Sequence, residues 1–135
     1  MVVFDLPIVA ISMSDSDLVE LEKLQKDGGF SSRSEVVRHS LQSLLAEHRA
    51  LQEYSGNIST IITVLYSEKG KNSKCNQVQH EFARLISAML HAHSSQGTCV
   101  EVMVVNGTAD EVRTFVQKFR SQKRVSRLQV SIAGR

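Results

Sequence analysis

The first third of the chain has the pattern of one short strand followed by two helices. Hydrophobic residues alternate along IVAISM, residues 8–13, which follows the only proline and predicts a strand with a period of two. SDSD, residues 14–17, places a capping serine and two carboxylates at a helix start, and Gly28-Gly29 is typical of its end. A second helix begins at SSRSE, whose second serine and glutamate have capping-box spacing, and continues to about residue 51.

The strand over residues 8–13 has no partner in its own half of the chain. No second strand is predicted before residue 50, although the backbone donors and acceptors of a strand require partners. The same strand of a second chain is the obvious candidate. The pattern therefore predicts a dimer in which two such strands pair antiparallel about a two-fold axis.

The pattern changes after the junction SGN at residues 55–57. The rest of the chain predicts, in order, a strand at 57–66, a helix at 72–83, strands at 83–93 and 98–105, a helix at 109–120 and a strand at 124–132. This order, βαββαβ, is that of the ferredoxin-like fold. We therefore expect an α+β protein with two domains, residues 1–53 and residues 54–135.

The same two segments differ in net charge. Residues 1–53 hold 5 Lys and Arg against 9 Asp and Glu, a net of −4, whereas residues 54–135 hold 11 against 5, a net of +6. Aromatic residues make up only 5% of the chain, which argues against binding single strands by base stacking. Two cysteines, no signal-peptide pattern and no long apolar run predict a cytoplasmic protein that does not enter membranes. The basic stretch KGKNSK at 69–74 is most simply a solvated loop.

Metal-ligating residue types gather between residues 80 and 99. His91 and His93 would project from the same face of a strand. If SSQGT forms the hairpin turn, His93 lies opposite Cys99 and His91 lies opposite Glu101 on the neighbouring strand. His80, at the end of the preceding helix, could complete the set from the same chain or from another, because spacing alone does not decide.

Three nitrogens and one sulfur suit a divalent ion of borderline softness. Ni(II) or Cu(II) fits a planar arrangement, Zn(II) a tetrahedral one, and Co(II) is a further possibility. Glu101 is better placed to hold a ligating histidine by its far nitrogen than to bind the ion itself. Four protein ligands leave no open position, so we expect sensing or structure rather than an enzyme. The competing interpretation is a surface His pair beside a small core cysteine.

The sequence resembles the NikR family of nickel-responsive regulators. The resemblance is carried by the strand IVAIS, by GFSSRSEVVRHSL, by the H-x₁₀-H-x-H-x₅-C spacing of the four metal-ligand candidates, and by the second βαββαβ segment. It implies an N-terminal ribbon-helix-helix module and a C-terminal ACT-like domain, assembled as a dimer of dimers. It also implies a planar Ni(II) site with His91, His93 and Cys99 from one chain and His80 from a neighbour.

The resemblance further implies that paired strands enter the major groove of double-stranded DNA. The residues that face the groove would be Ile8, Ala10 and Ser12, where the family carries charged or hydrogen-bonding side chains. Two of these three can contact only thymine methyl groups, so base readout should be weak. Phosphate contacts are expected where the second helix begins, at Ser32, Arg33 and Ser34.

These observations predict a cytoplasmic, homotetrameric regulator that binds operator DNA when nickel occupies its site. The alternative is a metal-binding protein that has lost operator recognition, which the apolar groove face and the acidic first segment favour. A metal-independent ribbon-helix-helix repressor of the antitoxin kind is a third possibility.

Overall fold

The computed structural model describes residues 6–134. The chain divides into two compact units between Leu44 and Leu45, inside the second helix and nine residues before the domain boundary that the sequence predicts. The helix itself is continuous across this division and ends at Glu53, which is where the sequence predicts the domain boundary. No helix within residues 6–134 has the length and apolar character that a membrane span requires.

The first unit contains α1 (Asp15–Asp27) and the larger part of α2 (Arg33–Glu53). The Ser14 hydroxyl accepts a hydrogen bond from the amide of Asp17 at 3.1 Å, which caps α1 as expected. The helix ends at Gly28, whose amide donates to the carbonyl of Leu24 at 2.9 Å. The Ser32 hydroxyl caps α2 in the same way, accepting from the amide of Glu35 at 3.1 Å.

Residues 6–14 make no strand hydrogen bonds in the single chain. The strand predicted over 8–13 is therefore not formed by the chain alone, in keeping with its lack of an internal partner. The apolar side chains Val9, Ile11 and Met13 nevertheless line an open hollow of about 750 Å³, together with Leu18 and Leu21 of α1.

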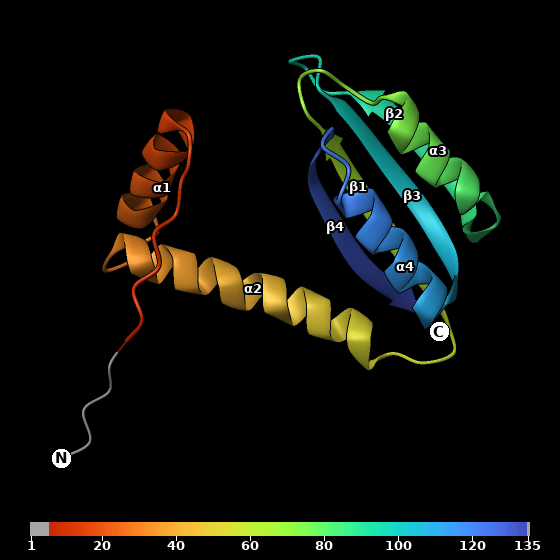
Figure 1. Ribbon diagram of the computed structural model, residues 1–135, viewed down its shortest axis with the longest axis horizontal. Helices are drawn as coiled ribbons and strands as arrows, with labels where there is room; N and C mark the ends of the chain where they lie inside the picture. The colour runs from red at the N-terminus through yellow and green to blue at the C-terminus, as the bar shows by residue number, and fades with distance from the viewer. Residues whose placement is uncertain (1–5, 135) are drawn as a thin grey trace. The chain divides into compact units, whose positions relative to one another are not determined.

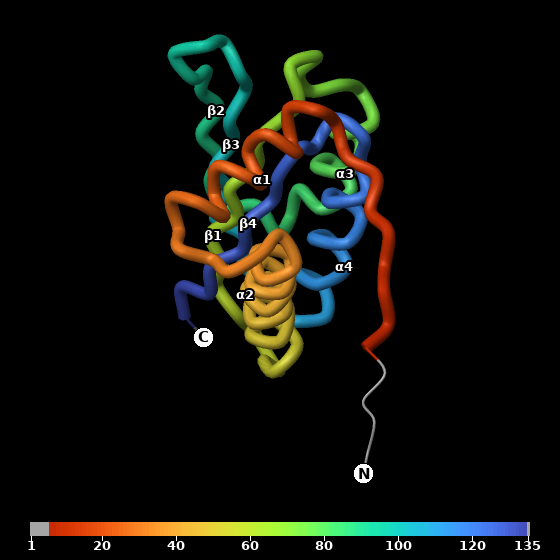
Figure 2. The backbone as a smooth tube through the Cα atoms, turned by 90° about the vertical axis from the view of Figure 1, so that its left-hand side faces the viewer, coloured from red at the N-terminus to blue at the C-terminus, as the bar shows by residue number. Residues whose placement is uncertain are grey.

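The second unit is a four-stranded antiparallel sheet with helices on one face (Figures 1 and 2). Its elements are β1 (Asn57–Tyr66), α3 (Ser73–Glu81), a short 3₁₀ helix (Ala83–Leu85), β2 (Ile86–His93), β3 (Cys99–Thr108), α4 (Ala109–Arg120) and β4 (Val125–Gly134). The predicted order βαββαβ is confirmed. The boundaries differ by a few residues, most notably at residues 83–85, expected at the start of β2 but found in the 3₁₀ turn that leads into it, and at the end of β3, which continues to Thr108.

The sheet has the order β2-β3-β1-β4, which puts β2 and β4 at its edges. Alternate residues of β1 are buried, as the period of two predicts. The helix-covered face holds the core, whose largest members are Ile58, Ile62, Tyr66, Met103, Phe115 and Phe119. The last turns of α2 belong to this unit, where Leu51 joins the core and Arg113 donates to the carbonyls of Leu51 and Tyr54 at 3.1 Å.

Candidate metal centre

The β2–β3 hairpin brings three metal-ligating side chains together. His93 pairs with Cys99 and His91 pairs with Glu101 across the two strands, which confirms the register predicted from the turn SSQGT. In the turn itself, the amide of Ser94 donates to the carbonyl of Thr98 at 2.8 Å, and Gly97 adopts the positive φ of 83°. A turn of fixed length sets which residues oppose one another, so it also places the ligands.

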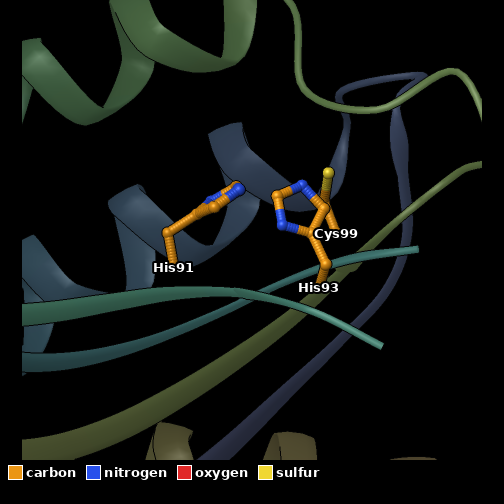
Figure 3. Close-up of side chains that lie close together, drawn as sticks. All are labelled: His91, His93 and Cys99. Carbon is orange, nitrogen blue, oxygen red and sulfur yellow. The ribbon is translucent and has the colours of Figure 1, made fainter. Parts of the chain in front are cut away.

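His91, His93 and Cys99 point to the same side of the hairpin (Figure 3). One ligand atom of each lies within 4.8 Å of the others, close enough for a single ion to contact all three. Both histidines are exposed and the cysteine is partly so, which leaves the cluster open to solvent and to a further ligand. Imidazole nitrogens and a thiolate together suit Ni(II), Cu(II) or Zn(II) rather than Ca(II) or Mg(II).

Glu101 lies opposite His91 on β3 and is only 1% exposed. Its Oε2 atom is 3.1 Å from Nδ1 of His91. An ionised carboxylate only accepts hydrogen bonds, so Nδ1 of His91 carries the proton and its Nε2 lone pair is left for an ion. The structure thus gives Glu101 the contact expected of a residue that orients a ligating histidine.

Three further side chains donate hydrogen bonds to Glu101. The hydroxyl of Tyr66 donates to Oε1. The side-chain amide of Gln79 donates to the same oxygen at 2.8 Å, and the ammonium of Lys71 donates to Oε2 at 3.1 Å. Burial by itself raises the pKa of Glu101, but the bonds from Tyr66, Gln79, His91 and Lys71 outweigh it and hold that pKa below its ordinary value. Burial and the neighbouring carboxylate raise the pKa of Tyr66, which stays a proton donor.

Sequence patterns do not indicate these three partners. Lys71 belongs to the stretch interpreted above as a solvated basic loop, and for this residue the interpretation is wrong, because its side chain is only 16% exposed and pairs with a buried carboxylate. Tyr66 and Gln79 follow ordinary strand and helix patterns, in which a polar atom on the buried face has no distinctive spacing. Only the tertiary structure shows that they share one acceptor.

His80 is not part of the three-residue cluster of its own chain, as far as residues 6–134 are concerned. It lies on the exposed side of α3, next to Gln79, which is buried. Successive helix residues project about 100° apart, so when Gln79 turns toward the sheet, His80 faces outward. The intrachain alternative that the sequence left open therefore has no support from the geometry of the single chain.

The residues expected to contact DNA lie in the first unit. Ile8, Ala10 and Ser12 are exposed, and Ile8 is 98% exposed. Arg33 is also exposed and pairs with Glu22 of α1. Ser32 is partly buried because it caps α2, whereas Ser34 is exposed.

Residues 59–133, more than half of the chain, match the family described as the NikR C terminal nickel binding domain. The chain belongs to the NikR family. A relative from Methanococcus maripaludis is 28% identical over 130 residues, covering 95% of the chain and 92% of the relative. One from Methanococcus aeolicus is 29% identical with the same coverage, and both are named as candidate nickel-responsive regulators. Such names describe regulators and not enzymes, in agreement with the expectation from sequence.

Among solved structures, an uncharacterised protein from Thermotoga maritima resembles the NikR chain with a TM-score of 0.50 at 14% identity. The similarity covers 58% of the chain and 99% of that protein. At this level of identity the likeness concerns the fold alone.

Replacing Glu101 by leucine should destabilise the metal-free protein by about 3 kcal/mol, because it leaves the Lys71 ammonium and three polar donors without their acceptor. Glu101→Gln should cost less, since its amide oxygen still accepts. Urea unfolding of the metal-free protein measures both. Glu81→Gln, which removes an exposed partner of Lys118, serves as the control and should cost about 1 kcal/mol or less. Equal losses for Glu101→Leu and the control would contradict the prediction.

Proposed function

We propose that this NikR protein is a transcriptional regulator whose DNA binding depends on Ni(II) held by His91, His93 and Cys99 of one chain and His80 of a neighbour. The observation that carries the proposal is the three-donor cluster on the β2–β3 hairpin, which lies inside the segment matched to a nickel binding domain. A fourth nitrogen would complete a planar N₃S set, a geometry that favours Ni(II) or Cu(II) over Zn(II).

The need for a second chain is supported by what the second unit exposes. His80 is exposed and, within residues 6–134, lies outside the cluster of its own chain, while that cluster is open to solvent. The sheet face opposite the helices presents apolar side chains, with Leu90 65% exposed and Ile61 and Val104 also exposed. Contiguous apolar surface on a soluble protein indicates an interface. We propose that these faces assemble a dimer of dimers, with the metal sites between chains.

The first unit supports a similar argument for DNA. Its open hollow, lined by Val9, Ile11 and Met13, would be filled by the matching segment of a second copy, and the paired strands would satisfy each other's backbone. Ile8, Ala10 and Ser12 would then face a major groove, while Ser32, Arg33 and Ser34 would meet phosphates at the start of α2.

Metal would control DNA binding through assembly. A site made by two chains binds its ion only when those chains hold a particular arrangement, so ion binding favours that arrangement over others. By linkage, DNA that fits the same arrangement tightens metal binding to the same extent. Metal affinity should fall at low pH, because the histidines must be neutral and the cysteine ionised to bind.

A second candidate is a metal-binding protein without operator recognition. The apolar face of Ile8 and Ala10 and the net charge of −4 over residues 1–53 favour it. Mobility shift of the protein's own promoter DNA, with and without Ni(II), Co(II), Cu(II) or Zn(II), separates the functions. A shift that needs metal supports the regulator, no shift with any metal supports the second candidate, and a shift indifferent to metal and chelator supports a metal-independent repressor.

Cys99→Ala should remove the thiolate-to-nickel charge-transfer absorption and abolish the nickel-dependent DNA shift, because the only sulfur ligand is removed. Absorption spectra during nickel titration test this. Cys75→Ala is the matched control, since that thiol is buried in the core and should leave the spectrum unchanged. A charge-transfer band that survives in Cys99→Ala would exclude this cysteine as a ligand.

Mixed oligomers test whether His80 acts on a neighbouring chain. His80→Ala and His91→Ala should each lack intact sites, but a pair containing one of each should hold one intact shared site, detectable by its charge-transfer band. Differently tagged chains, co-expressed and purified by both tags, provide the sample. A mixture of His91→Ala and Cys99→Ala is the control. Both changes remove a ligand from the β2–β3 hairpin, so every hairpin in the mixture lacks one ligand and no intact site can form. Absence of recovery in the first mixture would contradict a site shared between chains.

Arg33→Ala should weaken DNA binding similarly on all sequences, because an interaction with phosphate carries no base information. The dependence of log affinity on log salt should become shallower by about 0.9 for each phosphate that the variant no longer neutralises. Fluorescence anisotropy at several salt concentrations measures both effects. Arg49→Ala removes an equal charge from an exposed position of α2 beyond the proposed DNA-binding residues and should leave the salt slope unchanged.

A further inference from the structure

The loop between β1 and α3, residues 67–72, carries one lysine toward the interior and one toward solvent. Lys69 is exposed, whereas Lys71 turns inward and its ammonium lies 3.1 Å from Oε2 of Glu101. The same oxygen is 3.1 Å from Nδ1 of His91. Lys71 and a metal-ligand candidate therefore share a single acceptor atom.

The loop is anchored at several points, so the inward course of Lys71 is built into the fold. Arg124 donates to the carbonyls of Lys69 and Gly70 at 3.0 and 3.2 Å, and the Gly70 amide donates to the carbonyl of Ser67 at 2.7 Å. Asn72 ends the loop by capping α3, its side chain accepting from the amide of Cys75 at 3.1 Å. These hydrogen bonds fix the backbone on both sides of Lys71.

The loop also lies beside the sulfur of the cluster. A Cβ atom added to Gly70 would be 3.8 Å from Sγ of Cys99, an ordinary contact distance. The loop thus passes close to Cys99 at Gly70, and it is linked to His91 indirectly, through Lys71 and Glu101. Gly70 and Lys71 therefore lie beside the candidate metal centre.

We propose that Lys71 is a positioning residue of the metal centre, acting through Glu101. The ammonium holds Oε2 where it accepts the Nδ1 proton of His91, and this leaves Nε2 of the imidazole directed at the ion. It also neutralises a carboxylate that would otherwise be buried without a permanent cation. The inference rests on the proposed binding of nickel by His91 and adds to it the residue that sets how that histidine is presented.

Nickel affinity of the full-length protein, measured by competition with a chelator such as EGTA at one fixed pH, tests the inference. Lys71→Met keeps most of the side-chain length but removes the charge, and it should weaken nickel binding roughly 10-fold or more, the usual cost of losing a partner behind a metal ligand. Lys71→Arg should restore most of the affinity. Lys69→Met, on the same loop, should bind nickel like the wild type.

A second background shows whether Lys71 acts through Glu101. In Glu101→Gln protein, adding Lys71→Met should cause no further loss, because the shared acceptor charge is already absent. Metal-free melting temperatures of all variants, which should show one cooperative transition each, establish that they fold.

An affinity of Lys71→Met within threefold of Lys69→Met, or a full loss that persists in the Glu101→Gln background, would overturn the role of Lys71. Both results leave the proposed function intact, because the wild type still binds nickel. If instead His91→Ala binds nickel as tightly as the wild type, His91 is not a ligand, and the proposed site and the role of Lys71 both fall.

Discussion

The ionised carboxylate of Glu101, buried in the second unit, is the interaction on which the candidate site depends. A buried charge without partners costs several kcal/mol, so such a group persists only where donors surround it. Here the donors come from β1, the loop after it, α3 and β2, through Tyr66, Lys71, Gln79 and His91. One acceptor therefore ties four segments of the chain together, and the position of a metal-ligand candidate is set by the core.

This arrangement separates what the chain prepares alone from what it leaves to assembly. Three donors on one hairpin are already within 4.8 Å of one another, so an ion that binds them requires little further ordering of the chain. Among the described residues, 6–134, the exposed His80 belongs to no such preformed set. In the proposed function, the free energy of completing the coordination is then available to favour one arrangement of chains, which a site complete within a single chain could not do.

The sequence predicted the parts of this site that lie on strands, where side chains alternate between the two faces of the sheet with a period of two. Alternation along β2 and β3 and the length of the SSQGT turn determine the register, so the pairing of His93 with Cys99 and of His91 with Glu101 followed from the sequence alone. The role of Lys71 could not be predicted, because a loop has no period and its inward direction depends on hydrogen bonds from Arg124, far away in sequence. The strand over residues 8–13 remains a prediction for a related reason, since its partner would be another chain.

The apolar groove face of the first unit changes how specificity would have to arise in the proposed regulator. The side chains of Ile8 and Ala10 could contact thymine methyl groups but not hydrogen-bond a base edge, which would leave Ser12 as the one polar side chain that reads bases on each proposed strand. Phosphate binding by Arg33, as proposed, would add affinity without sequence information. Two dimers fixed in one assembly, however, require two half-sites at one separation, and the discrimination at each half-site then adds in free energy. Because the base contacts would be weak, the fixed separation of the two half-sites that metal imposes would itself supply much of the sequence specificity.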